Sequence, residues 1–148
     1  MVRLDVIETE VPSAEALEML KAYAAVSAEG QDTLLMSMLK RAFSIVQKYA
    51  DKALLAGKWR ICADDHYGVV KVYMGGSVES VTDRHGLIAF RQECNEVYVG
   101  TEGYVEIVFT TTPVSEDYDM LLPVVLRYAT ALYDGKDTVE LNRILKEC

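Results

Sequence analysis

The clearest periodic signal in the chain lies at residues 32–53, which read DTLLMSMLKRAFSIVQKYADKA. Apolar residues recur there every three or four positions, the spacing that places side chains on one face of an α-helix. This apolar stripe consists of Leu35, Met38, Leu39, Ala42, Ile45, Val46, Tyr49 and Ala53. The segment therefore predicts an amphipathic helix of about five turns, with an N-cap at Asp32 and a stop at Gly57.

A shorter helix is predicted upstream, so that the two form an N-terminal helix pair. Ser13 is a favourable N-cap for a helix that begins at Ala14, and Glu15 in its first turn suits the helix dipole. We predict a loop at residues 27–31 between the two helices. Residues 1–11 are predicted to be a flexible N-terminal segment.

The pattern changes to a period of two between about residues 58 and 112, which predicts five or six short antiparallel strands. The adjacent glycines Gly75 and Gly76 predict a tight hairpin between two of these strands, because glycine adopts positive φ without steric cost. Residues 83–86 and 92–95 carry two further turn signals. In the last strand, Val105, Ile107 and Phe109 are predicted to share one face.

Helical spacing returns after Pro113, with an apolar series from Leu121 to Leu132. Pro123 favours a start at Leu122, because proline is tolerated at the first position of a helix and kinks its interior. Gly135 predicts the end of this helix, and Asp137 predicts the cap of a short final one. The sequence therefore predicts a single α+β domain over residues 1–148: an N-terminal helix pair, a central antiparallel meander or small sandwich, and C-terminal helices.

The composition excludes several classes of protein. Of the 148 residues, 51% are hydrophobic and 26% are charged, which is typical of a globular chain. The net charge of −8 is unsuited to sequence-independent binding of nucleic acid. No apolar run approaches the roughly 20 residues of a membrane span, and the N-terminus lacks the layout of a signal peptide. Three widely spaced cysteines, Cys62, Cys94 and Cys148, favour a reducing compartment over a disulfide framework.

Few residues form a pattern that could carry chemistry. Asp64-Asp65-His66 supplies oxygen and nitrogen atoms that could bind a metal, but neighbouring residues on an extended chain point to opposite faces, so a polar turn is the favoured interpretation. His85 lies in the turn at 83–86 and has the same interpretation. The chain has no nucleophile elbow and no phosphate-binding loop. We therefore predict a protein that is not an enzyme and that needs no cofactor or metal.

Charge is distributed unevenly along the chain. Residues 40–60 contain six basic residues and one acid, Asp51, whereas the stretch up to Glu18 contains five acids and one basic residue, Arg3. The two zones could be two solvated faces, or they could meet across a head-to-tail subunit contact, where complementary charge sets the register. The basic zone consists of Lys40, Arg41, Lys48, Lys52, Lys58 and Arg60, and the acidic zone of Asp5, Glu8, Glu10, Glu15 and Glu18.

Four stretches, taken in order, resemble the small head–tail connector (head-completion or adaptor) proteins of tailed bacteriophages and prophages. They are the opening helix PSAEAL at residues 12–17, the long helix running on into KALLAGKW at 52–59, the segment GSVESV at 76–81 with Asp83 and Gly86, and the strand VEIVFT at 105–110 followed by Leu122-Pro123 and the helix to Tyr133. The chain departs from the family pattern at Ala50-Asp51-Lys52, where Thr-Gly-Arg is usual. It also lacks the glycine that is common between Thr110 and Pro113, and no family pattern continues past Gly135.

The resemblance implies a structural protein of the virion. Family members form a ring of about twelve or thirteen subunits under the portal, and this ring extends the DNA channel and docks tail or stopper proteins. The implied location is the head–tail junction of a particle assembled in the bacterial cytoplasm, and DNA would pass through the channel without specific binding. We expect the helix pair to supply subunit contacts and the Gly75-Gly76 turn to reach a partner or the channel. The contact residues expected are Glu15, Glu18, Lys40, Arg41, Lys48, Lys52, Gly75 and Gly76.

Two alternatives remain open from the sequence. A small cytoplasmic adaptor or chaperone-like module, acting as a monomer or dimer, would share this arrangement of helices and strands. An enzyme that uses a metal at Asp64-Asp65-His66 would need those three side chains to converge on one ion.

Overall fold

The computed structural model describes residues 1–25 and 30–148, so residues 27–29 of the predicted loop lie outside the described part. Contacts divide the chain into two compact units. Residues 1–10 and 55–113 form the first, which we call the sheet unit, and residues 11–54 and 114–148 form the second, which we call the helical unit. The chain passes from one unit to the other three times. The α+β class predicted from the sequence is confirmed.

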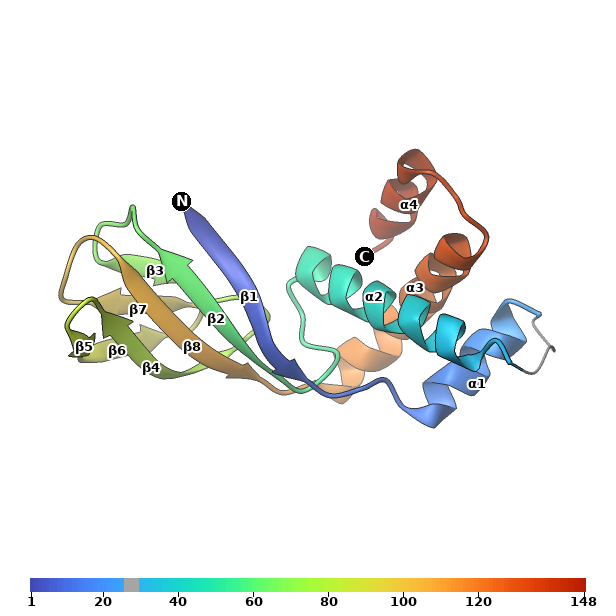
Figure 1. The fold of residues 1–148 in the computed structure, drawn as a ribbon, viewed down its shortest axis with the longest axis horizontal. Coiled ribbons are helices and arrows are strands. Elements are labelled where there is room, and N and C mark those ends of the chain that lie inside the picture. Colours follow the sequence, from blue (N-terminus) through green and yellow to red (C-terminus); the bar gives the residue numbers. More distant parts are fainter. Residues whose placement is uncertain (26–29) are drawn as a thin grey trace. The chain divides into compact units, whose positions relative to one another are not determined.

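The sheet unit contains two antiparallel sheets (Figure 1). The first has the strand order β1-β2-β8-β4-β5, formed by β1 (Val2–Thr9), β2 (Gly57–Ala63), β8 (Val105–Thr111), β4 (Ser77–Asp83) and β5 (Gly86–Leu87). The second has the order β3-β7-β6, formed by β3 (Val69–Lys71), β7 (Glu96–Val99) and β6 (Phe90–Glu93). All pairings between the strands are antiparallel, and side chains alternate between the two faces along each strand.

The core of the sheet unit comes from one face of the first sheet and from the apolar residues of β3 and β7. On β8, Val105, Ile107 and Phe109 are fully buried, as their shared face predicts. On β2, Trp59 and Ile61 are buried, and they lie opposite Phe109 and Ile107 in the ladder. The Trp59 indole N–H donates a hydrogen bond of 3.2 Å to the Thr111 hydroxyl, so the polar atom of this large side chain is satisfied inside the core.

Strand β1 replaces the flexible segment that the sequence predicts for residues 1–11. It pairs antiparallel with β2 from Val2 opposite Ala63 to Thr9 opposite Gly57, with a bulge at Ile7. The side chains of β1 alternate as a strand requires, with Val2, Leu4 and Val6 on the face that carries Trp59. The prediction of flexibility was wrong because the partner of this strand lies about fifty residues away in the sequence.

The predicted hairpin at Gly75-Gly76 is also wrong. Strands β3 and β4, on either side of it, belong to different sheets and do not pair. The chain instead turns from one sheet to the other, with the Gly76 N–H donating to the Tyr73 carbonyl oxygen at 3.0 Å. The two other turn signals are confirmed: residues 83–86 connect β4 to β5, and residues 92–95 connect β6 to β7.

The helical unit contains α1 (Ala14–Tyr23), α2 (Asp32–Ala50), α3 (Ser115–Tyr133) and α4 (Thr138–Leu145). The predicted caps at Ser13 and Asp137 are confirmed, since their side chains accept hydrogen bonds from the N–H groups of Ala16 and Glu140. Asp32 is the first residue of α2, and Gln31 occupies the N-cap position. Helix α2 ends at Ala50 because Asp51 adopts a left-handed conformation with φ of 56°, so the helix stops before Gly57 is reached.

Helix α3 begins seven residues earlier than predicted and contains Pro123 in its interior. Proline removes one hydrogen bond of the helix, but its ring lies on the exposed side while Leu121, Leu122 and Val125 are buried. Phe43 of α2 stacks on Tyr118 of α3, with ring centroids 6.0 Å apart. The apolar packing of α3 therefore outweighs the local preference of proline. No helix in the described residues is long and apolar enough to cross a membrane.

The two adjacent glycines predict different effects of substitution. Gly76 is buried, and a Cβ atom there would overlap the ring of Phe109. Gly75 has open space around it, and its φ of +63° is the main obstacle to a side chain. We expect Gly76→Ala to lower the free energy of unfolding by about 2–3 kcal/mol through overpacking, and Gly75→Ala by about 1 kcal/mol through backbone strain.

Denaturant unfolding of the two variants and the wild type checks this ranking. Equal effects of the two substitutions would contradict the packing of Gly76 under Phe109.

Candidate functional site

The acidic residues Glu15 and Glu18 lie on α1, and both are exposed. Glu18 is engaged within its own unit, because its Oε1 lies 3.4 Å from Lys21 Nζ. Lys21 Nζ also lies 2.6 Å from Asp32 Oδ1 on α2, and the bond to Asp32 raises the pKa of Lys21 above its ordinary value. This chain of charges ties α1 to α2. Glu15 is the more available of the two carboxylates for an external contact.

The basic residues Lys40, Arg41 and Lys48 project from α2, and Lys52 follows its C-terminus; all four are exposed. Arg41 and Lys48 are seven residues apart and therefore lie on the same face of the helix. Lys40 lies at a groove of about 430 Å³ between α1 and α2. The groove is lined by Leu17, Asp32, Thr33, Met36, Ser37 and Lys40. Three of the predicted contact residues therefore lie on α2, and Lys52 lies two residues beyond its last residue.

The remaining members of the two charge zones meet inside one chain. In the ladder of β1 and β2, Asp5 lies opposite Arg60 and Glu8 lies opposite Lys58. Arg60 Nη2 lies 3.9 Å from Asp5 Oδ2. The antiparallel register therefore places part of the acidic zone beside part of the basic zone.

Other ion pairs extend this charged face of the sheet. Arg3 Nε lies 2.9 Å from Asp5 Oδ2, and Lys58 Nζ lies 3.3 Å from Glu79 Oε2 on β4. These pairs satisfy Asp5, Lys58 and Arg60 within one chain, without any second subunit. The helical members of the zones, on α1 and α2, are not paired across the β1–β2 ladder and remain candidates for a subunit contact.

Of the two glycines expected to contact a partner, only Gly75 is exposed, and Gly76 is buried. Glycine at position 76 is explained by its packing against Phe109. An external contact at this turn would therefore involve Gly75.

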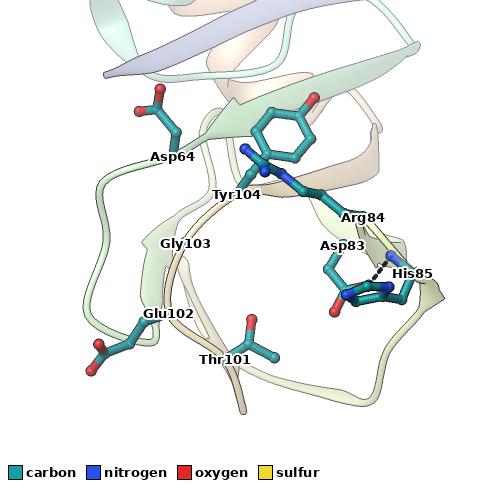
Figure 2. A pocket seen from close by; sticks show the side chains of 8 residues that line it. All are labelled: Asp64, Asp83, Arg84, His85, Thr101, Glu102, Gly103 and Tyr104. Atoms are coloured by element: carbon teal, nitrogen blue, oxygen red, sulfur yellow. Dashed lines mark hydrogen bonds between the residues drawn. The ribbon is translucent and has the colours of Figure 1, made fainter.

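Two polar turns that are far apart in the sequence line one hollow of the sheet unit (Figure 2). Asp64 comes from the segment after β2, and Asp83, Arg84 and His85 come from the β4–β5 turn. The hollow has a volume of about 400 Å³, and residues 101–104 complete its lining. The His85 N–H donates to Asp83 Oδ1 at 2.7 Å, which fixes the turn, and Asp64 Oδ1 lies 2.6 Å from the Met1 amino nitrogen.

The structure separates the three residues of the candidate metal site. Asp64 and Asp65 are exposed, whereas His66 is buried, and its Nδ1 accepts a hydrogen bond of 3.0 Å from the Gly68 N–H. Within residues 1–25 and 30–148, no group of three histidine, cysteine, aspartate or glutamate side chains is arranged to hold a metal ion. Asp64-Asp65-His66 is a turn that connects β2 to β3.

A short polar network lies beside the hollow, on the charged face of the sheet. The Tyr104 hydroxyl donates to the Glu106 carboxylate, and this bond raises the pKa of Tyr104 above its ordinary value, with Cys62 contributing further. Arg3 Nη2 lies 3.7 Å from the sulfur of Cys62. Cys62 is buried, whereas Cys94 and Cys148 are exposed, and all three are free thiols.

One surface, the outer edge of β1, was not predicted from the sequence. Val6 and Ile7 are each about half exposed, although they belong to a strand whose neighbour is fully paired. The alternation of Val2, Leu4 and Val6 with Arg3 and Asp5 was the available signal. This alternating stretch is short and ends in acidic residues, so it resembles a polar segment.

Three solved structures share this fold. A chain from the neck of an empty gene transfer agent particle, computed with C6 symmetry, superposes with a TM-score of 0.63 at 18% identity, covering 89% of this chain and 84% of that one. A chain from the virion of the native particle gives 0.61 at 19% identity, covering 88% and 84%. A chain from the neck of the native particle, computed with C12 symmetry, gives 0.55 at 17% identity, covering 95% and 94%.

The chain therefore shares its fold with chains of gene transfer agent particles. The similarity extends over both units, since 88–95% of the chain is covered in each comparison. No protein-family model matches the chain, and no curated protein matches it. The likeness therefore lies in the fold and not in any close sequence relationship.

The pairing of Asp5 with Arg60 predicts the outcome of a charge exchange. Arg60→Glu places two carboxylates beside each other on β1 and β2, and we expect it to lower the free energy of unfolding by about 0.5–1 kcal/mol, since the pair is partly solvated. Adding Asp5→Arg should recover part of this loss. Denaturant unfolding of the two single variants and the double variant, arranged as a double-mutant cycle, measures the coupling. A coupling of zero would contradict the internal pairing.

The Tyr104–Glu106 bond predicts a titration. Because the folded-state pKa of Tyr104 is raised, its contribution to stability is present below the ordinary tyrosine value of about 10 and is lost as the pH rises through the raised pKa. Glu106→Gln should lower the pKa of Tyr104 toward that ordinary value. Carbon-13 NMR of labelled tyrosine rings, with Tyr104→Phe for assignment, follows the change. An unchanged titration in Glu106→Gln would contradict the assignment of the shift to Glu106.

Proposed function

We propose that this protein is a structural neck component of a phage-like particle, a head–tail connector that acts as one subunit of a ring and has no enzymatic activity. The observation that carries the proposal is the shared fold with three gene transfer agent chains over nearly the whole length of this one. A likeness that includes both units supports a common role better than a match to one unit would, because a ring subunit uses its surfaces in combination.

The symmetry of the neighbouring particles supports the ring. Two of the three neighbours come from necks computed with C6 and C12 symmetry. Rotational symmetry of this kind requires a head-to-tail contact, in which one surface of a subunit meets a different surface of the next. On this proposal, the ring has about twelve or thirteen subunits, lies under the portal and presents a docking surface to tail or stopper proteins.

The charge of the chain is compatible with a channel through which DNA passes. The net charge is −8, and Asp5, Arg60, Lys58 and Glu79 neutralise one another on the outer face of the sheet. Tight binding of duplex DNA depends on lysine and arginine side chains that neutralise phosphates. A subunit of this composition would let DNA pass without holding it.

We further propose that α1 and α2 contribute to the subunit contact through charge. Glu15 and Glu18 present carboxylates on α1, and Arg41 and Lys48 present cations along one face of α2. Opposite charges on two helices of the same unit suit a head-to-tail contact between neighbouring copies.

Assembly tests the proposed function directly. Negative-stain imaging and analytical ultracentrifugation of the concentrated protein, alone and mixed with a candidate portal protein, should show closed rings with a central channel. A chain that remains monomeric or dimeric in both preparations would contradict the connector role and favour the adaptor alternative.

Charge reversal tests the helical contact separately. We expect Lys48→Glu and Glu15→Lys to weaken ring formation and to reduce its sensitivity to salt, because a screened charge contact is lost. Sedimentation at about 50 and 500 mM salt measures both effects. Assembly and salt dependence that match the wild type in both variants would contradict the proposed contact.

A further inference from the structure

The first sheet of the sheet unit has two free edges, and they differ in chemistry. Its strand order places β1 at one edge and β5 at the other. In Figure 1, β1 (blue) and β5 lie on opposite sides of the sheet. An unpaired edge presents a row of backbone N–H and C=O groups, which native proteins cover, charge or use for binding.

The β1 edge is long and apolar along one face. Val2 is 49% exposed, Val6 52% and Ile7 46%, whereas the β2 residues opposite Val2 and Val6, Ala63 and Trp59, are buried. The apolar inner face of the sheet is therefore buried at β2 and exposed to solvent at β1. An apolar stripe beside the unpaired edge of an eight-residue strand is the arrangement that accepts another extended segment.

The β5 edge presents a short segment, residues 86–89, which read GLIA, before the chain enters β6 of the second sheet at Phe90. Leu87 is 78% exposed and Phe90 is 38% exposed, and Ala89 between them is also exposed. This segment is held to the sheet on one side only, by the pairing of Leu87 with Thr82 and by a hydrogen bond of 2.9 Å from the Ile88 N–H to the Val81 carbonyl. Its apolar side chains thus lie on the surface of an otherwise ordered edge.

The charges at the two edges are complementary. Residues 84–89 contain Arg84 and His85 and no acid, whereas residues 6–10 contain Glu8 and Glu10 and no base. Within the described residues, neither Glu8 nor Arg84 forms an ion pair, and Glu8 is exposed at the edge strand. Pairing of β1 with a second β1 would bring the acidic residues of two copies together, which disfavours the symmetric contact.

We infer that the segment from Arg84 to Ala89 of one copy packs against the β1 edge of the next copy, so that the sheets of neighbouring subunits continue into one another. The occupant of the β1 edge is a second copy of this chain. The inference rests on the proposed ring and names the surfaces that close it. The two edges lie on opposite sides of the same sheet. A copy that makes this contact through one edge therefore keeps its other edge free for a further copy, as a ring requires.

Acidic substitutions in the two apolar edges test this contact. We expect Val6→Glu and Leu87→Glu each to reduce the fraction of chains in rings by about tenfold or more, because each places a carboxylate without a partner in the contact. Val139→Glu, at a residue of the helical unit that is 77% exposed, is the matched control and should assemble as the wild type does. Circular dichroism establishes that each variant is folded.

Mixing the two edge variants gives the sharper result. Val6→Glu retains an intact β5 edge, and Leu87→Glu retains an intact β1 edge, so one productive contact remains between unlike chains. We expect native mass spectrometry to detect a one-to-one heterodimer in the mixture, and monomers in each variant alone. A symmetric contact through β1 would instead leave Leu87→Glu as a homodimer.

Charge exchange provides a second measurement that does not alter the apolar stripe. Glu8→Arg and Arg84→Glu should each weaken assembly, and the double variant should recover it, because the opposite charges are restored in exchanged positions.

The outcomes separate this inference from the proposed function. Rings that persist in Val6→Glu and Leu87→Glu, or that are lost equally in Val139→Glu, would overturn the edge contact and leave the connector role intact. A wild-type chain that stays monomeric even with its portal protein would overturn both.

Discussion

The antiparallel pairing of β2 with β8 is the constraint on which the rest of the sheet unit depends. It runs without a bulge from Gly57 opposite Thr111 to Ala63 opposite Val105, and it joins segments about fifty residues apart. On one face it stacks Trp59 beside Phe109 and Ile61 beside Ile107, all of them buried. Because these two strands occupy the centre, β1 is left at one edge, and the other edge is formed by the short β5.

This central pair also determines which face of the sheet carries the charged side chains. The side chains of β2 that alternate with its buried residues point to the opposite face, so Lys58 and Arg60 lie together on the outer surface. Strand β1 brings Asp5 and Glu8 to the same surface, in register with them. The result is a sheet with one apolar face and one face of mixed charge. Its apolar face is incompletely covered only at the β1 edge.

Much of the fold could be predicted from the sequence, because its strongest signals are local. The helical period of residues 32–53, the caps at Ser13 and Asp137, and the shared face of the last strand depend on neighbours within a few positions. Strand β1 could not be identified in this way, because its partner is distant in sequence. A hairpin between residues 69–74 and 78–81 was predicted wrongly, because a two-glycine turn fits a link between two sheets as well as a hairpin.

The candidate surface was predictable only in part. Counting charges identified two zones of opposite sign, but the β1–β2 register shows that Asp5 and Arg60 meet within one chain. The exposed residues of α1 and α2 remain as proposed contacts, and the apolar edges at β1 and β5 add surfaces that no charge count could identify. Pro123 illustrates the same limit, since its local preference was outweighed by the burial of Leu121, Leu122 and Val125.

The most direct test of a ring closed by opposite sheet edges is hydrogen exchange of the same protein in its assembled and dissociated forms. The account predicts that amides of residues 2–9 and 84–89 gain protection on assembly, because the unpaired backbone groups of both edges become covered. Protection confined to the helical unit, with both edges exchanging as they do in the free subunit, would contradict it.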